Sequence, residues 1–412
     1  MAALLLHNAT LIDGTGADPM PLTSVLVEGG LIRRVASTDT LYPPSDGRTI
    51  DLQGMTLMPG LTDAHVHFGL VGLNGASNRS PDDNLLTYAL SVVENIEIAL
   101  QEGFTTVRDA AGLDPAFARA TEQGLIKGPR ILPSGSALSQ TGGHGDHRNR
   151  YDDSPQRPVL GILAATMLVD GADAVRLAAR MQLRLGATQI KVMASGGVMS
   201  QLDTLESVQF TVEEIKAAVH EAQAAGTYVL AHCHTSPSMN NVLDAGVRSI
   251  EHGSILDEAT ARRIVQQNAF VVPTLLVIEE LARSPEAQGI SHYSQMKLAY
   301  VHKQMPASIE IAMRSGVALG SGSDILGARQ TGRGEELSLK AKALGSMSAI
   351  VSATQTNARL FNLEDRIGSV QEGMEADLIA VAGDPLTKIE LLDDANNVWL
   401  VIKGGEIVKE TL

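Results

Sequence analysis

The stretch Pro59-Gly60-Leu61-Thr62-Asp63-Ala64-His65-Val66-His67 governs the interpretation of the rest of the chain. After the Pro-Gly pair, the apolar run predicts a strand over Leu61–Phe68. Alternate residues of a strand face the same side, so His65 and His67 project together from its end. Two imidazoles placed in this way can hold one metal ion. A His-x-His pair alone is a weak signal, because a lone strand-end histidine is more often just hydrogen-bonded.

Seven more apolar strands follow, separated by helical patterns. The expected strands are Thr105–Asp109, Ile131–Ser136, Gln189–Ala194, Tyr228–His232, Ser249–His252, Phe270–Leu275 and Val317–Ser321. The expected helices include Leu85–Gln101, Ala172–Leu185, Val212–Ala225, Glu258–Gln267 and Ser308–Arg314. Eight strands alternating with helices predict an α/β fold of the (β/α)8 TIM barrel type. A doubly wound open sheet is the rival, but no glycine-rich phosphate fingerprint follows the first of these strands.

Both ends of the chain carry short strands joined by glycine turns. Gly29-Gly30 and Gly404-Gly405 each separate two β-branched runs, which is a hairpin signal. The middle of the chain lacks this pattern. We therefore expect a small discontinuous β-sandwich built from residues 1–57 plus 365–412, and a catalytic barrel over 58–364.

Composition limits the classes of function. Hydrophobic residues make up 44% of the 412 residues and charged residues 19%, which excludes a disordered chain. The formal net charge of −15 argues against nucleic-acid binding. No apolar run is long enough to span a bilayer, and the run from Ala2 to Leu6 is a poor signal peptide, so no membrane association and a cytoplasmic location are expected. A chain from which a secretory signal had been trimmed would look the same.

Polar residues stand at the carboxyl ends of several expected strands. Lys191 lies in the apolar run Ile190-Lys191-Val192-Met193, where a lysine must lose its charge, find a partner or be modified. The others are His232 and His234, His252, and Asp324. In a barrel these strand ends form one rim, where catalytic residues gather. The full set is not expected to meet on one rim by chance.

In this order, His65-x-His67, Lys191, His232, His252 and Asp324 resemble the motif set of the amidohydrolase superfamily, over almost the whole chain. Three segments are similar to its prolidase and aryl-carboxypeptidase-like branch, to which ochratoxin-hydrolysing amidohydrolases belong. They are Ile190-Lys191-Val192-Met193-Ala194-Ser195-Gly196-Gly197, Ala231-His232-Cys233-His234 and Ile250-Glu251-His252-Gly253.

The resemblance implies two divalent metal ions, with zinc the expected metal. His65, His67 and Asp324 would hold the more buried ion, and His232 and His252 the other. Lys191, carboxylated by CO2, would bridge them, because a carbamate offers two anionic oxygens whereas an ammonium repels cations. Asp324 would also act as the catalytic acid–base, moving a proton to the leaving nitrogen.

Two further histidines are candidate substrate contacts. His144 lies in the loop Gly142-Gly143-His144-Gly145-Asp146, where the resemblance implies a role in binding the carbonyl oxygen; a solvent-facing side chain is the alternative. His234 could read a substrate carboxylate or support the metal site. The choice of His232 rather than His234 as the ligand rests on the resemblance.

Several neighbouring residues are given structural roles. Cys233, the single cysteine, is expected to pack in the core, and Arg108 and Asp109 to form an ion pair near the rim. Met193, Met199 and Met239 could line an adaptable apolar pocket, although core packing is favoured for Met193.

The expected function is hydrolysis of the amide bond of N-acyl or aryl-acyl amino acids, small molecules with a free carboxylate. An ochratoxin-type amide that releases phenylalanine fits this description. A lactonase or phosphotriesterase on the same metals is the first alternative, and a structural homologue without metals is the second; the intact ligand set argues against the latter. Apolar barrel helices and the resemblance also suggest a homo-oligomer, with an octamer as one form.

Overall fold

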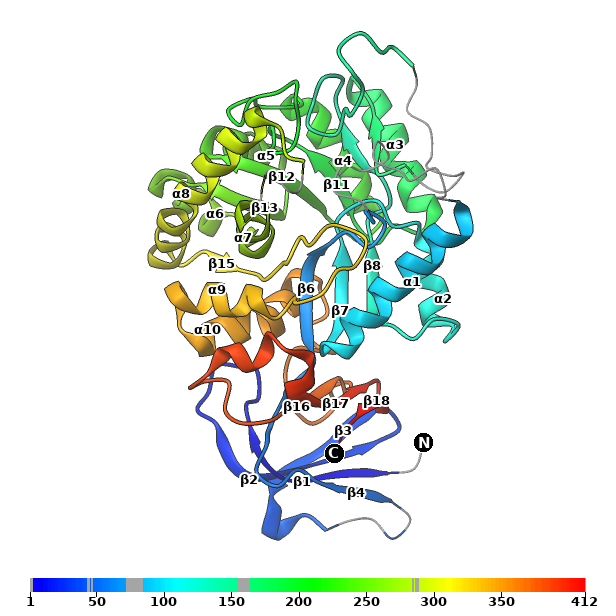
Figure 1. Cartoon of the computed structure of the whole chain (residues 1–412), viewed down its shortest axis with the longest axis vertical. Coiled ribbons are helices and arrows are strands. Elements are labelled where there is room, and N and C mark those ends of the chain that lie inside the picture. Colours follow the sequence, from blue (N-terminus) through cyan, green and yellow to red (C-terminus); the bar gives the residue numbers. More distant parts are fainter. Residues whose placement is uncertain are drawn as a thin grey trace.

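The computed structural model describes residues 3–42, 45, 47–71, 84–154, 164–283, 285 and 289–411. The strands of the two chain ends, blue and red in Figure 1, lie together at one end of the molecule. The middle of the chain forms the larger part, in which helices surround parallel strands (Figure 1).

Strands from both termini join one sheet. Its members are β1 (Leu4–Leu11), β2 (Met20–Glu28), β3 (Leu31–Ser37), β4 (Arg48–Asp51), β5 (Thr56–Pro59), β16 (Leu378–Val381), β17 (Val398–Lys403) and β18 (Glu406–Glu410). The order is β18-β17-β16-β5-β1-β2-β3, and β4 pairs with the first half of β1. The antiparallel pairing of β5 with β16 joins the two ends of the chain.

This sheet bears out the expected small β domain. Gly29, Gly30, Gly404 and Gly405 all have positive φ, as tight hairpins between β2 and β3 and between β17 and β18 require. The described strands form one continuous sheet that divides at β1, and both arms contribute to one apolar core. The boundaries 1–57 plus 365–412 and 58–364 stay a prediction.

The barrel consists of two parallel sheets. The first holds β6 (Leu61–Val66), β7 (Phe104–Asp109) and β8 (Arg130–Pro133). The second holds β9 (Ala137–Ser139), β10 (Thr166–Leu168), β11 (Ile190–Met193), β12 (Val229–Thr235), β13 (Ser249–Ile255), β14 (Phe270–Val272) and β15 (Ala318–Leu319).

Backbone hydrogen bonds close these sheets into a ring. Thr188 N donates to Pro133 O at 2.8 Å, which joins the start of β11 to β8. Ala64 N donates to Ser321 O at 2.8 Å, which joins β6 to the end of β15. The ring of β6, β7, β8 and β11 to β15 follows the predicted strand order, so the (β/α)8 prediction is confirmed. Strands such as β6 and β7 are buried on both faces, as parallel strands inside a helical layer must be.

The helices are α1 (Leu85–Gln101), α2 (Pro115–Glu122), α3 (Ala172–Leu185), α4 (Val212–Ala224), α5 (Ser236–Ala245), α6 (Glu258–Gln266), α7 (Leu275–Arg283), α8 (His292–Ser315), α9 (Glu335–Leu344), α10 (Ser346–Val351) and α11 (Asn357–Leu360). A π-helical turn, Ser352–Thr356, lies between α10 and α11. Capping boxes fix the starts of α1, through Asn84 and Thr87, and of α4, through Thr211 and Glu214.

Two of the predicted boundaries that were wrong have a clear local cause. Helix α8 begins at His292 rather than Ser308, because the chain stays helical through Pro306, a residue that usually ends a helix. The strand expected to reach Leu275 stops at Val272, because Pro273 follows and α7 begins at Leu275. Among the described helices, none combines the length and the apolar character needed to cross a bilayer.

Candidate active site

The structure brings the predicted site residues together at the carboxyl ends of the barrel strands. Six imidazole rings form a continuous cluster, with neighbouring centroids 4.3–5.1 Å apart. The cluster comprises His65, His67, His144, His232, His234 and His252. The proposed metal ligands and His234 are at most 9% exposed. His144 is half-buried against His232, which contradicts a loop side chain that simply faces solvent.

His65, His67 and Asp324 form a compact set of donor atoms. The two Nε2 atoms of the histidines lie 3.2 Å apart, and Asp324 Oδ1 lies 3.2 Å from His67 Nε2 and 3.7 Å from His65 Nε2. A tetrahedral zinc site with its usual bond lengths separates neighbouring ligand atoms by roughly 3.3–3.4 Å. The three atoms therefore fit one face of such a site without rearrangement.

In each candidate ligand ring, a hydrogen bond to one nitrogen fixes the ring and leaves the other nitrogen available. Nδ1 is held in His65 by Glu251 at 2.6 Å, in His67 by Ala111 O at 2.8 Å and in His252 by Thr274 Oγ1 at 2.8 Å. His232 is the reverse case, because its Nε2 lies 3.3 Å from Gly196 O. This arrangement leaves Nε2 of three rings, and Nδ1 of His232, for a metal, which is how metal-binding histidines are usually oriented.

Burial keeps most of these imidazoles neutral. It lowers the pKa of His65 to about 4, with the nearby Lys191 adding to the effect. Burial, and then neighbouring imidazoles, hold the pKa values of His232 and His252 well below the usual value. Burial would lower the pKa of His67 too, but the hydrogen bond to Asp324 and the charge of Asp324 outweigh burial and raise this pKa. Neutral imidazole is the form that binds metals.

Asp324 lies between the two groups of histidines. Its Oδ1 faces His65 and His67, and its Oδ2 lies 3.7 Å from His252 Nδ1. Burial alone would raise its pKa, but the interaction with His65 and the hydrogen bond from His67 outweigh burial and lower it overall, so it is a carboxylate. The backbones of Asp324 and His252 have φ values of 56° and 70°. Left-handed backbone is uncommon at non-glycine residues, although Asp and His are among those that adopt it most readily.

Lys191 is 1% exposed on β11, as the sequence indicated. Burial lowers its pKa to about 8, against the opposing charges of Glu251 and Asp324. A larger fraction of free amine is therefore present near neutral pH than in an exposed lysine. Free amine is the form that reacts with CO2.

One predicted contact was wrong. Arg108 pairs with Glu251, not with Asp109, because neighbouring residues on a strand point to opposite faces. Arg108 Nη2 lies 2.8 and 2.9 Å from the two Glu251 oxygens, and Glu251 in turn holds His65. Asp109 instead accepts hydrogen bonds from the backbone of Phe68 and Leu113.

The sequence reasoning missed Glu251 as a site residue. A carboxylate next to His252 in the otherwise apolar strand start Ser249-Ile250 was the available signal. Arg108 bonds both of its oxygens, and Ser249 Oγ donates to one of them at 2.5 Å. Burial alone would raise the pKa of Glu251, but Arg108 and His65 outweigh burial and lower this pKa to about 2. The residue is therefore a fixed anion behind His65.

The residues given packing roles behave as follows. Cys233 and Met239 are fully buried in the largest apolar core, and Met193 packs with Ala111 and Ala137. Met199 packs against a separate cluster around α7 and α8.

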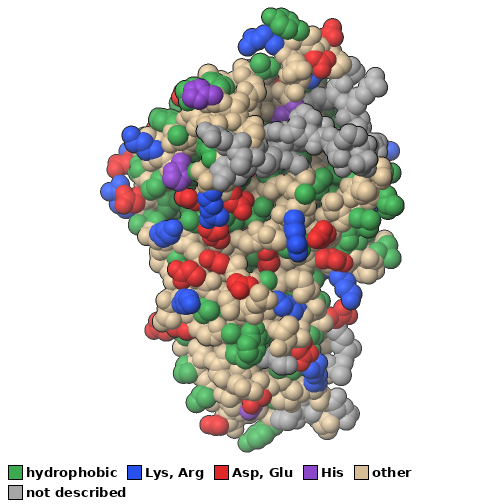
Figure 2. All heavy atoms as spheres, in the orientation of Figure 1, with side chains coloured by type: hydrophobic (Ala, Val, Ile, Leu, Met, Phe, Trp, Pro, Cys, Tyr) green, Lys and Arg blue, Asp and Glu red, His purple; other side chains and the backbone are tan. Residues whose placement is uncertain are grey.

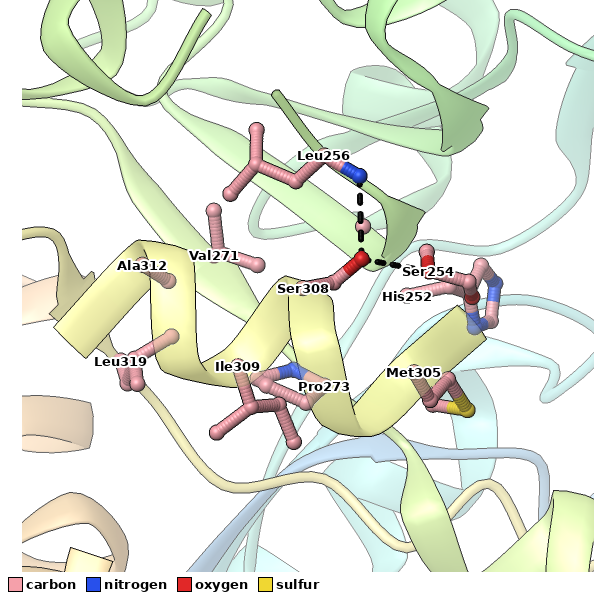
Figure 3. Close-up of a pocket in the computed structure, with 11 residues that line it drawn as sticks. His252, Ser254, Leu256, Val271, Pro273, Met305, Ser308, Ile309, Ala312 and Leu319 are labelled. Atoms are coloured by element: carbon pink, nitrogen blue, oxygen red, sulfur yellow. Dashed lines mark hydrogen bonds between the residues drawn. The ribbon is translucent and has the colours of Figure 1, made fainter. Parts of the chain in front are cut away.

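A small cavity between β13, β14 and α8 reaches His252 and is lined largely by apolar side chains (Figure 3). Beside it, the Ser308 hydroxyl donates to the backbone carbonyl of Ser254. On the face shown in Figure 2, acidic and basic side chains are interspersed across the middle of the molecule.

Comparison with known proteins gives a consistent result. The model of the amidohydrolase family matches residues 56–408. Ochratoxinase from Aspergillus niger is 32% identical, and the match covers 98% of this chain and 86% of that protein. Its crystal structure superimposes with a TM-score of 0.86 at 29% identity, over 99% of this chain and 96% of that one.

Two solved peptidases are also similar. A prolidase crystallised with N-methylphosphonate-L-proline has a TM-score of 0.93 at 38% identity, with all of both chains covered. A Xaa-Pro dipeptidase with methionine bound in its active site has a TM-score of 0.88 at 30% identity, over 99% of this chain and 100% of that one. On the family match and the near full-length relative, the chain belongs to the amidohydrolase family and is a hydrolase that acts on amide bonds.

Proposed function

We propose that the chain is a binuclear metal-dependent amidohydrolase that releases an amino acid with a free carboxylate from an N-acyl or aryl-acyl group. The observation that carries this proposal is the position of Asp324, which turns one oxygen to His65 and His67 and the other to His252. A carboxylate so placed can serve a nucleophile held between two ligand sets.

The two ligand sets would each hold one zinc ion. His65, His67 and Asp324 would form the first set, and His232 Nδ1 with His252 Nε2 the second. Lys191, carboxylated on Nζ, would supply one oxygen to each. Ions bound there lower the pKa of water and polarise the carbonyl of the scissile amide.

Asp324 would carry the proton. An amide nitrogen is a poor leaving group until it is protonated, so a base that accepts a proton from the attacking water and then returns it to nitrogen serves both halves of the reaction. The nearby histidines keep its carboxyl deprotonated in spite of burial. Oδ2 is the oxygen available for this transfer, because Oδ1 faces His65 and His67.

Substrate recognition would fall to His234 and His144. His234 lies within the ring cluster, 4.7 Å from His232 and 5.1 Å from His252, but is not needed to complete either ligand set. Both ligands seen in the similar peptidase structures, N-methylphosphonate-L-proline and methionine, carry an amino-acid carboxylate. Together with the ochratoxinase likeness, this supports substrates such as ochratoxin A, which would give ochratoxin alpha and phenylalanine.

A matched panel of substrates tests the proposal. Zinc-loaded protein should hydrolyse N-acetyl-phenylalanine, benzoyl-phenylalanine or ochratoxin A, and should be far slower on the methyl ester of the same acyl amino acid. Equal rates on acid and ester would refute the carboxylate requirement. Hydrolysis of a lactone or a phosphotriester without any amide hydrolysis would favour the alternative function on the same residues.

The assembly state is also part of the proposal. Light scattering of the purified chain should give a mass that is a multiple of 43.5 kDa, with an octamer as one expected form. A mass equal to one chain at assay concentrations would contradict it.

A further inference from the structure

A polar network outside the ligand set holds His144 from behind. His144 N donates to Gln209 Oε1 at 2.9 Å, and Gln209 Nε2 donates to Asp203 Oδ2 at 3.0 Å. His144 Nδ1 lies 3.0 Å from Ser200 Oγ. Ser200, Asp203 and Gln209 all belong to the segment between β11 and α4. His144 is thus held through its backbone N–H and through ring atom Nδ1, and Nε2 takes no part in these contacts.

Counting protons on Ser200 fixes the direction of the bond to His144. The hydroxyl has one hydrogen and three neighbours that could accept it: Gly197 O at 3.0 Å, His144 Nδ1 at 3.0 Å, and Asp203 Oδ1, which is nearer than either. A carboxylate is a stronger acceptor than a carbonyl or an imidazole. With its hydrogen directed to Asp203, Ser200 Oγ offers only lone pairs to His144. The contact at Nδ1 is then favourable only if Nδ1 carries a hydrogen.

Lys297 on α8 secures the carboxylate end of this chain of bonds. Its Nζ donates to Gly197 O at 2.5 Å and to Ser200 O at 2.6 Å, and lies 3.5 Å from Asp203 Oδ1. An ammonium has no lone pair, so it can only donate to Asp203 and leaves Asp203 as the acceptor for the Ser200 hydrogen. Lys297 is 7% exposed and has no part in the mechanism proposed above.

We propose that neutral His144 carries its proton on Nδ1, and that Lys297 is a positioning residue that enforces this tautomer through Asp203 and Ser200. Gly197 makes the arrangement sterically feasible. A side-chain carbon at residue 197 would lie 2.2 Å from Cε1 of His144, so the ring can lie against this loop only because residue 197 is a glycine.

The tautomer decides what His144 can do for a substrate. With the proton on Nδ1, Nε2 keeps its lone pair, in a ring that stacks on His232 with 4.3 Å between the centroids. A neutral His144 then accepts a hydrogen from an N–H group of the scissile amide or its amine product, and does not donate to the carbonyl oxygen as the family resemblance implies. Carboxylate recognition passes to His234. This consequence rests on the proposed function, whereas the tautomer itself does not.

Nitrogen NMR on the zinc-loaded full chain tests the proposal without substrate. With 15N-labelled histidine, long-range proton–nitrogen correlations distinguish the two neutral tautomers, and the signals of His144 are identified by their loss in His144→Gln. The wild type should show Nδ1 protonated and Nε2 bare. Ser200→Ala and Lys297→Met should shift His144 toward the Nε2-protonated form. Lys303→Met, which alters an exposed lysine of the same helix, should leave it unchanged.

Two results would overturn the proposal. One is Nε2 protonated in the wild type, and the other is an unchanged Nδ1-protonated pattern in both Ser200→Ala and Lys297→Met. If Lys297→Met does not fold, the wild type and Ser200→Ala still decide. The spectrum is independent of turnover, so a failure to hydrolyse any amide would count against the proposed function and leave this result intact.

Discussion

The two halves of the candidate metal site are built from the same residue type but supported differently. His65 is backed by a charged chain, because Glu251 bonds its Nδ1 and Arg108 bonds both oxygens of Glu251. His232 and His252 are backed by neutral groups, the carbonyl of Gly196 and the hydroxyl of Thr274. An anionic partner raises the basicity of an imidazole more than a neutral one does. The half with His65 and His67 should therefore bind its ion more tightly.

Removal of the metal ions is expected to have the largest effect on amide hydrolysis. Chelation should abolish amide hydrolysis, and addition of zinc should restore it. The difference in support also predicts two steps: one equivalent should leave at low chelator and the second only at higher chelator. Metal analysis of dialysed samples measures both. Full activity in protein that contains no metal would contradict the account, and loss of both ions in one step would remove the distinction between the halves.

Replacement of Lys191 removes the group that would join the halves. We expect Lys191→Ala to lose nearly all activity and much of the metal, since no anion then bridges the two sets. Acetate or propionate should restore part of both by occupying the space of the side chain. Lys191→Arg serves as the matched control, because it fills that space and cannot be carboxylated. An alanine variant with both metals and normal rates would exclude the bridge.

Asp324→Asn separates the proton transfer from the overall shape of the site. The amide cannot accept the proton, so turnover should fall on the order of 10²–10⁴-fold. Metal content must be measured beside the rate, because Asp324 would also be a ligand of the first half. A rate within about threefold of the parent would show that Asp324 has only a structural role.

Glu251→Gln tests the charged support directly. The amide oxygen can still accept a hydrogen bond from His65, but the negative charge is lost, so metal affinity or activity should fall about 10–100-fold. Thr274→Val, which removes the support of His252, should have a smaller effect. Glu251→Gln also leaves Arg108 as a buried unpaired charge, so the free energy of unfolding of this variant should drop by about 3–5 kcal/mol. Equal effects of the two variants would refute the proposed asymmetry.

Strand-end reasoning predicted that the candidate ligands would lie together, because it needs only local pattern and barrel topology; their role as metal ligands stays a prediction. His65, Lys191 and Asp324 each follow an apolar run, and the carboxyl ends of barrel strands meet at one rim. The residues that support the candidate ligands could not be predicted from local pattern, because they come from distant parts of the sequence. Arg108 and Glu251, which form an ion pair, are 143 residues apart in the sequence, and Lys297 and Gly197, which share a hydrogen bond, are 100 residues apart.

The errors have local physical causes. Arg108 and Asp109 are adjacent with opposite charges, which resembles an ion pair in sequence, but strand geometry directs them to opposite faces. The helix predicted over Ser308–Arg314 covers only the last part of α8, which begins at His292. Because Lys297 lies on the part of α8 before Pro306, the network around His144 was also missed.

A crystal structure of the zinc-loaded chain, grown with bicarbonate and recorded at the zinc absorption edge, would show whether two metal ions share a carboxylated Lys191. The account predicts two anomalous peaks in each chain. One lies among His65, His67 and Asp324, the other lies beside His232 and His252, and additional density on Lys191 Nζ reaches both. A single peak, or two fully occupied peaks beside an unmodified Lys191 amine, would contradict it.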